Sequence, residues 1–326
     1  MPGLCNHRNT PRRVSLPTLW IVMLFVAGSS ILPACRRASK ASSISSGQND
    51  QQVQVATQDV PDQPVAELCV TPGPPPVEPQ HRQKRFKRFK HTAKTPAQPQ
   101  LITVVFHVIN NGDSPAKGNV SEQQIVEQVQ VLNDAFRPLF EFKLDPKIDR
   151  YTKLDWYKME PKSDEETAAM ATYGVKDKAV LNVYTAGISV LGWAVPPWEA
   201  LSASPYRDGV VIHFSTLPHG THFSHDQGKT LIHEFAHWLG LYHIYEGCFD
   251  PGDYVLDTPP EEAEPSSSCP FDRDSCTNDN LGDLADNFMD SIPDTCATHF
   301  TTGQFERMWT KFNACRRPGL GPCSPY

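Results

Sequence analysis

One stretch, HEFAHWLGLYH at residues 233–243, constrains the fold and chemistry of this 326-residue chain more than any other feature. His233 and His237 are four residues apart, so a helix through them places both imidazoles on one face, where they can share one Zn²⁺ ion. Glu234 lies next to the first of these histidines, at the position of a general base for a metal-bound water. The stretch therefore predicts a helix that carries half of a catalytic zinc site.

Two further residues complete the pattern. Gly240, three residues after His237, can adopt the left-handed conformation that ends a helix and turns the chain. His243 then returns as a third zinc ligand, and three protein ligands leave one position open for water, as in a catalytic zinc site. The full pattern resembles the metzincin signature, which requires a methionine turn downstream. Met289, in the run NFMD, fits that turn and is expected to form an apolar floor below the ligands.

The residues around this stretch indicate a mixed α/β (α+β) fold. β-branched runs that end at turn residues indicate strands, and a capping box at Ser121 begins a helix of about 16 residues. A proline-rich run is unsuited to an inner strand and fits a loop or a sheet edge. The expected strands are 101–109, 180–184 and 209–214, and the proline-rich run is 192–198. No internal repeat or regular βαβ unit is visible, so we expect several strands near a few helices.

Charge is distributed unevenly along the chain. Residues 97–326 hold 32 of the 37 acidic residues and 17 of the 30 basic ones, a net charge of −15. Because nucleic-acid binding needs clustered Lys and Arg, this region is a poor nucleic-acid binder. Its acidity suits bound cations or basic partners, or serves solubility alone. No glycine-rich phosphate-binding loop is present, so nucleotide chemistry has no support.

Residues 1–35 indicate an export signal. Three arginines precede the apolar run 19–27, which matches a signal peptide and is too short for a comfortable transmembrane helix. The sequence Leu-Pro-Ala-Cys that follows is similar to a bacterial lipobox in which Cys35 receives lipid, although proline is not the favoured residue there. We therefore expect export, with lipid on Cys35, free secretion and an uncleaved anchor as alternatives.

Residues 36–96 have the composition of a linker and pro-segment, rich in Ser, Gln and Pro. The basic run HRQKRFKRFK at 81–90 lies between this segment and the acidic region, so we expect a protease-sensitive activation site there. Alternatively, this basic run could bind a membrane or nucleic acid, or could be a solvated arm. Residues 97–326 then form the folded domain.

Export permits disulfides, and the cysteines suit a disulfide framework. Six of the nine lie in the C-terminal third, an even number, while Cys69 in the pro-segment is the odd one. The sequence alone leaves three pairings open for the first four of the six. The six are Cys248, Cys269, Cys276, Cys296, Cys315 and Cys323.

Further motifs make the chain resemble the pappalysin (cytophagalysin) family of metzincins over roughly residues 100–312. They are FHVI at 106–109, GNVS at 118–121, LGWA at 191–194, DGVV at 208–211, GKT at 228–230, GDYVLDTP at 252–259 and FTTGQFERM at 300–308. The resemblance implies an N-terminal subdomain, about 97–240, with a twisted mixed sheet, backing helices and an active-site helix. It implies an irregular, disulfide-bonded C-terminal subdomain, about 241–326, with the active-site cleft between the two.

The same resemblance implies a structural calcium ion and specific disulfides. Asp253, the carbonyl of Val255 and Thr258 match the family's calcium ligands, and hard oxygen ligands suit Ca²⁺. An ordinary acidic turn is the alternative for this loop. The disulfides implied by the cysteine order are Cys248–Cys276 and Cys269–Cys296, which leaves Cys315–Cys323 as a C-terminal loop closure.

The tripeptide Cys69-Val70-Thr71 resembles the Cys-Gly-Thr of family zymogens, in which a thiolate takes the open zinc position and blocks the water. Val70 replaces the glycine, so the segment departs from the family's turn. An unpaired or intermolecularly paired linker cysteine is the alternative. This resemblance therefore predicts a latent precursor.

Two residues near the methionine turn bear on rate and specificity. The family usually has a tyrosine two residues after the methionine, whose hydroxyl steadies the tetrahedral intermediate, but this chain has Ser291 there. Loss of one such donor typically lowers kcat by about 10²–10³. Asp294, in the wall expected to receive the residue after the scissile bond, would favour Arg or Lys there by charge pairing.

We therefore predict a secreted or surface-anchored zinc endopeptidase, made as a zymogen, that acts on proteins or peptides. A catalytically weak, zinc-containing surface lipoprotein that binds proteins is the first alternative, motivated by Ser291 and Cys35. A metallohydrolase acting on other bonds is the second, and the length of the zinc motif argues against it. The expected partners are substrates and, through lipid on Cys35, a membrane, but not nucleic acid.

Overall fold

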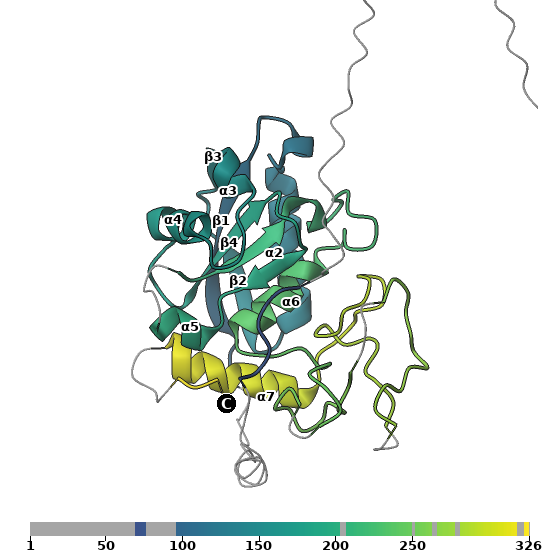
Figure 1. Cartoon of the computed structure of the whole chain (residues 1–326). Helices are drawn as coiled ribbons and strands as arrows, with labels where there is room; N and C mark the ends of the chain where they lie inside the picture. The colour runs from purple at the N-terminus through teal and green to yellow at the C-terminus, as the bar shows by residue number, and fades with distance from the viewer. Residues whose placement is uncertain are drawn as a thin grey trace, which may run out of the picture. The chain divides into compact units, whose positions relative to one another are not determined.

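A computed structural model gives the structure of the protein (Figure 1). It describes residues 69–75, 96–202, 207–249, 252–262, 266–277, 281–317 and 323–325. The expected export signal with Cys35 and the basic run 81–90 lie outside the described residues. None of the helices in the described ranges is long and apolar enough to cross a membrane.

The described strands form one twisted, mixed sheet with the order β2-β1-β4-β6-β5, and β3 also pairs with β1. All neighbours run parallel except β5, which is antiparallel to β6 and lies at the edge. β1 is buried along nearly its whole length, as expected for a strand that is covered on both faces. The strands are β1 (Gln100–Asn110), β2 (Phe140–Leu144), β3 (Asp149–Thr152), β4 (Val180–Ala186), β5 (Gly192–Ala194) and β6 (Val210–His213).

Helices α2 and α6 lie together against the sheet: α2 packs on β2 and α6, and α6 packs on β5 and β6. The rings of Phe136 and Phe235 join the two helices edge to face at 4.8 Å. The helices are α2 (Glu122–Phe136), α3 (Leu154–Tyr157), α4 (Asp164–Tyr173), α5 (Pro197–Ser202), α6 (Lys229–Trp238) and α7 (Thr302–Lys311). Short turns of other helix types are η1 (Pro115–Lys117), η2 (Phe214–Thr216) and the π-helical η3 (Phe312–Arg316).

Local signals place the helix ends. Ser121 and Gln124 form the predicted capping box, and α2 runs for 15 residues from it. α6 ends at Trp238, and Gly240 follows with a left-handed φ of 91°, as the sequence predicts. The proline-rich run 192–198 supplies the edge strand β5, and its second half begins helix α5, which the sequence analysis did not expect.

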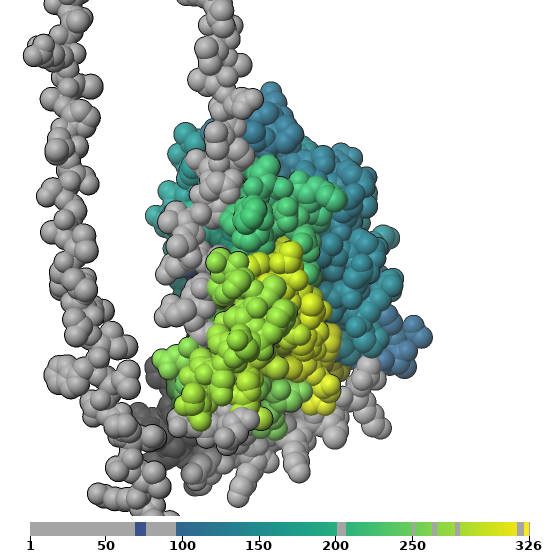
Figure 2. Space-filling model, turned by 90° about the vertical axis from the view of Figure 1, so that its right-hand side faces the viewer, coloured from purple at the N-terminus to yellow at the C-terminus, as the bar shows by residue number. Residues whose placement is uncertain are grey.

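The described residues between α6 and α7 contain no strand or helix, only turns, loops and isolated bridges. Figure 2 shows these segments, in light green, beside the yellow C-terminal residues and below the blue-green first half. Two disulfides tie this region together, Cys248–Cys276 and Cys269–Cys296, and a third, Cys315–Cys323, closes a loop after α7. The predicted fold class is confirmed, with a mixed sheet and helices followed by an irregular disulfide-bonded region.

Candidate active site

The three histidines of the zinc stretch come together at one point. Helix α6 carries His233 and His237 on one face, and the turn at Gly240 returns the chain so that His243 meets them. The Nε2 atom of His237 lies 3.0 Å from Nε2 of His233 and 3.1 Å from Nε2 of His243. The site is therefore built from ring nitrogens that face one another.

The opposite nitrogens of these rings face outward to acceptors. His233 Nδ1 lies 2.7 Å from the carbonyl of Phe288, and His237 Nδ1 lies 2.9 Å from the carbonyl of Leu241. Because a carbonyl only accepts hydrogen bonds, these Nδ1 atoms carry the protons and both Nε2 atoms present lone pairs. Burial lowers the pKa values of His233 and His243 to about 3, which keeps both rings neutral at neutral pH.

Neutral lone pairs that converge at this distance repel one another unless a cation lies among them. A tetrahedral zinc with bonds of about 2.05 Å to nitrogen and 2.3 Å to sulfur sets its ligands roughly 3.3 Å (N to N) and 3.6 Å (N to S) apart. The sulfur of Cys69 lies 3.5 Å from His237 Nε2, and its sulfur and the three imidazoles offer ligand atoms within 4.8 Å of one another. The donor set therefore fits a zinc ion.

Residues 69–71 lie along the edge strand β5. Cys69 forms a parallel bridge with Gly192, and the N–H of Val70 donates to the Gly192 carbonyl at 3.4 Å. The Thr71 hydroxyl accepts from the Ala194 N–H at 2.9 Å. Residues 69–71 therefore lie against the β5 edge of the sheet.

Glu234 is buried between residues 69–71 and the sheet. Its Oε2 accepts a hydrogen bond of 3.1 Å from the Thr71 hydroxyl, and burial raises the pKa of Glu234 to about 8. Gly192 makes room for it, because a Cβ at that position would lie 3.0 Å from Glu234 Cγ and 2.8 Å from the Val211 carbonyl. The glycine of the LGWA motif thus allows β5 to approach the carboxylate closely.

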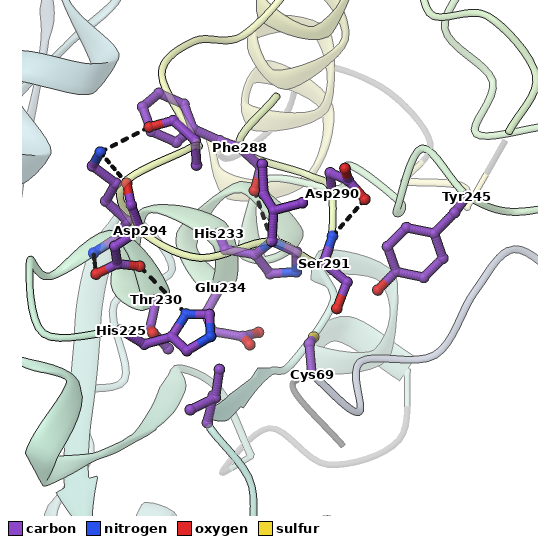
Figure 3. Close-up of a pocket in the computed structure, with 14 residues that line it drawn as sticks. Cys69, His225, Thr230, His233, Glu234, Tyr245, Phe288, Asp290, Ser291 and Asp294 are labelled. Atoms are coloured by element: carbon purple, nitrogen blue, oxygen red, sulfur yellow. Dashed lines mark hydrogen bonds and ion pairs between the residues drawn. The ribbon is translucent and has the colours of Figure 1, made fainter. Parts of the chain in front are cut away.

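A pocket opens beside these groups (Figure 3). Asp294 lines one wall, where its Oδ2 accepts from the Gln227 N–H at 2.8 Å and its Oδ1 lies 3.5 Å from His225 Nδ1. The Lys229 ammonium donates to the carbonyls of Asp294 and Ala297. Asp294 therefore lies in the pocket wall, as the sequence predicts. His225 and Lys229, which the sequence did not indicate, line the same wall.

The methionine turn lies next to the histidines. Met289 is fully buried, and its carbonyl accepts from the N–H of Ile244 at 3.3 Å, one residue after His243. The preceding residue, Phe288, supplies the carbonyl that orients His233. The turn is therefore bonded to the segments that carry two of the three imidazoles.

Two hydroxyl residues lie on the same side of the pocket. Tyr245 stacks on the imidazole of His243, with ring centres 4.6 Å apart and planes at 13°. Ser291, at the position where the family usually has tyrosine, also lines the pocket and is buried. Tyr245 was not predicted from the sequence. Its position two residues after His243 could have indicated that it lies near the metal site.

The three residues expected to bind calcium also come together, apart from the pocket. The Thr258 hydroxyl lies 2.9 and 3.0 Å from the Asp253 carboxylate oxygens and 3.1 Å from the Val255 carbonyl. Burial raises the pKa of Asp253 to about 7. None of the three lines the pocket beside Glu234.

Sequence comparison with known proteins also indicates a metalloprotease. The sequence profile of the M43 peptidase family, described as pregnancy-associated plasma protein-A, matches residues 189–313. An extracellular metalloprotease of Colletotrichum graminicola is 38% identical over 225 residues, which cover 66% of this chain and 79% of the relative. Extracellular metalloprotease 1 of Coccidioides posadasii is 35% identical over 222 residues, with coverage of 65% and 78%.

The fold is also similar to those of solved metalloprotease structures. Mature mirolysin of Tannerella forsythia, in complex with a cleaved peptide, matches with a TM-score of 0.57 and 31% identity over 67% of this chain and 93% of that one. A promirolysin mutant of the same organism matches with a TM-score of 0.59 and 29% identity, with coverage of 72% and 86%. The chain therefore belongs to the M43 (pappalysin) family of metzincins and is a zinc metalloendopeptidase.

Proposed function

We propose that His233, His237 and His243 hold the catalytic zinc and that Glu234 is the general base of peptide-bond hydrolysis. The observation that carries this assignment is the convergence of three Nε2 atoms, with the rings of His233 and His237 held by hydrogen bonds at Nδ1. Carbonyl partners of this kind orient ligand imidazoles and set their tautomers. When bound, zinc acidifies a water molecule and polarises the scissile carbonyl.

Glu234 moves the proton in this scheme. The carboxylate takes a proton from the attacking water and passes it to the leaving amine. Burial raises the pKa of Glu234 to about 8, which lets the carboxyl group hold the transferred proton until it passes to the amine. Met289, buried in the turn that supports His233 and Ile244, serves as the apolar floor of the ligand set.

We propose that the chain is made as a zymogen in which residues 69–71 block the site. The Cys69 sulfur takes the fourth ligand position, and the Thr71 hydroxyl binds the general base. Val70 replaces the family's glycine, yet its N–H donates to the edge strand. One of the similar solved structures is that of a promirolysin mutant, which supports a precursor form for this chain as well.

Release of the blocking segment requires a cut in the chain. We place that cut in the basic run 81–90, before the domain that starts near residue 97 and divides near residue 240. Curated relatives are named extracellular metalloproteases, which supports an extracellular location and an export signal over residues 1–35. Lipid on Cys35 would retain the enzyme at the membrane. Mass spectrometry of the secreted and membrane fractions distinguishes lipidated from free protein.

We propose that Asp253, the Val255 carbonyl and Thr258 bind a structural calcium ion. Their oxygens already converge, and the carboxylate is buried at 4% exposure with no ammonium or guanidinium hydrogen-bonded to it among the described residues. Hard oxygen ligands of this kind prefer Ca²⁺. Calcium binding to the whole chain, measured by calorimetry, should disappear in Asp253→Ala while zinc content stays unchanged.

The pocket wall supports a preference for Arg or Lys after the scissile bond. Asp294 supplies the negative charge, although its Oδ2 is already bonded to main-chain N–H groups and Lys229 competes for the same wall. A peptide library should therefore show basic residues at this position, and Asp294→Asn should abolish the preference. A profile without basic residues would remove this assignment.

The test of the main assignment is cleavage of a quenched fluorescent peptide library by zinc-loaded, activated protein. Glu234→Ala should abolish cleavage and leave the zinc content unchanged, because the carboxylate is not one of the ligands. A variant that still cleaves at the wild-type rate would contradict the role of Glu234. Folded, zinc-loaded wild-type protein that binds peptides without cleaving them would instead favour a protein-binding surface molecule.

A further inference from the structure

Two hydroxyl side chains, those of Tyr245 and Ser291, line the pocket beside Cys69. Figure 3 shows the hydroxyl end of the Tyr245 ring directed toward the Cys69 sulfur, with the Ser291 side chain next to it. The Tyr245 hydroxyl has no hydrogen-bond partner among the described residues. It is therefore a free donor that is aimed into the site.

We propose that Tyr245 is a further catalytic residue, whose hydroxyl donates a hydrogen bond to the oxyanion that develops on the scissile carbonyl. This inference rests on the proposed function. The Cys69 sulfur lies where the three imidazoles leave a fourth position, so a donor aimed at that sulfur is aimed at the place of the reacting oxygens once the segment has left. Tyr245 keeps its proton throughout, and no bond to it forms or breaks.

The fold holds this donor in place before substrate arrives. The Tyr245 ring lies parallel to the His243 imidazole, which limits its rotation. The residue between them, Ile244, is bonded through its N–H to the Met289 carbonyl. A preorganised donor of this kind needs no reorganisation during the reaction, which is the source of its effect on the barrier.

Ser291 is the competing donor. It occupies the usual position of a stabilising tyrosine, but its side chain is much shorter, and its main-chain N–H is bonded to Asp290 Oδ1 at 2.7 Å. The Tyr245 hydroxyl is directed toward the thiol from the other loop, the one that carries His243. We therefore assign the donor role to Tyr245 and use Ser291 as the comparison.

The experiment uses the zinc-loaded full chain with Cys69→Ala and Thr71→Ala, which removes the blocking side chains. Tyr245→Phe and Ser291→Ala are compared with this parent, and Tyr173→Phe serves as a matched control, because Tyr173 lies on α4 stacked on Tyr151. Three quantities are measured: kcat on a quenched peptide, the Kd of a phosphinic peptide by calorimetry, and the zinc content. The phosphinic group mimics the tetrahedral oxyanion, so its Kd reports on the donor without turnover.

Tyr245→Phe should lower kcat about 10²–10³-fold and weaken phosphinic-peptide binding by a similar factor, at unchanged zinc content. Tyr173→Phe should match the parent. The proposal is overturned if Tyr245→Phe keeps both kcat and Kd within about threefold of the parent, or if its activity falls only in proportion to lost zinc. It is also overturned if Ser291→Ala alone reproduces both losses.

Different results would refute the peptidase assignment and the role of Tyr245. If the parent does not cleave peptides, the proposed function fails, but the phosphinic-peptide measurement still decides the role of Tyr245. Weaker binding by Tyr245→Phe than by the parent would support the donor even then. Equal binding by the two proteins would refute it.

Discussion

The Thr71 hydroxyl offers the sharpest test of the proposed zymogen, in which residues 69–71 block the site. It donates to Glu234 Oε2 at 3.1 Å and accepts from the Ala194 N–H at 2.9 Å, and Thr71 is buried. Thr71→Val keeps the shape of the side chain and removes both hydrogen bonds. We expect this change to weaken the blocking segment although the cysteine is intact.

The structure allows the size of the effect to be worked out. A hydrogen bond to a charged group contributes about 1.5–3 kcal/mol, and a neutral one about 0.5–1.5 kcal/mol. Loss of both therefore costs about 2–4.5 kcal/mol, or roughly a 30- to 1,600-fold rise in the inhibition constant. Thr71→Ser keeps the hydroxyl and should restore most of the inhibition.

Peptides that cover residues 69–75 provide the assay. Their inhibition constants against the activated enzyme are compared for the natural sequence, Thr71→Val and Thr71→Ser. A Thr71→Val peptide that inhibits within about threefold of the natural one would refute the reasoning, because the two hydrogen bonds would then contribute almost nothing. Equal weakening by Val and Ser would instead point to a loss of packing.

Further outcomes follow from the same structure. Chelation of zinc should abolish activity and lower the Tm, and added zinc should restore both, since a ligand that binds only the folded state stabilises it. Burial raises the Asp253 pKa to about 7, so the protonated acid stabilises the calcium-free fold and this contribution is lost as pH rises from 3.8 through 7; calcium should therefore raise the Tm more at pH 8 than at pH 6. Thr301→Ala, which removes the cap that accepts from the Gln304 N–H, should cost about 1 kcal/mol in urea unfolding. Arg273→Met, which leaves three buried carboxylates without their partner, should cost about 3–5 kcal/mol in the same measurement.

Short-range patterns were the reliable part of the sequence. The spacing of His233 and His237 requires only one helical turn, and the left-handed Gly240 requires only local backbone freedom. The capping box at Ser121 likewise depends on residues within four positions. These features were predictable because neighbours in the chain determine them.

Elements without a clear local pattern were missed. β2 and β3 are short and partly exposed, and each gains its place only by pairing with β1. α4 has apolar residues without a clear face, and α5 begins within a proline-rich run. The secondary structure of such segments depends on tertiary pairing and packing, so it could not be predicted from local sequence patterns.

The sequence by itself determined the catalytic metal chemistry, because the zinc motif lies within eleven residues and depends on helix geometry. Only the tertiary structure brought Cys69 and Thr71 to His237 and Glu234, more than 160 residues away in the chain. It also directed the Tyr245 hydroxyl into the pocket. The physical reason is that such contacts depend on how the edge strand and the irregular loops pack, which no local spacing specifies.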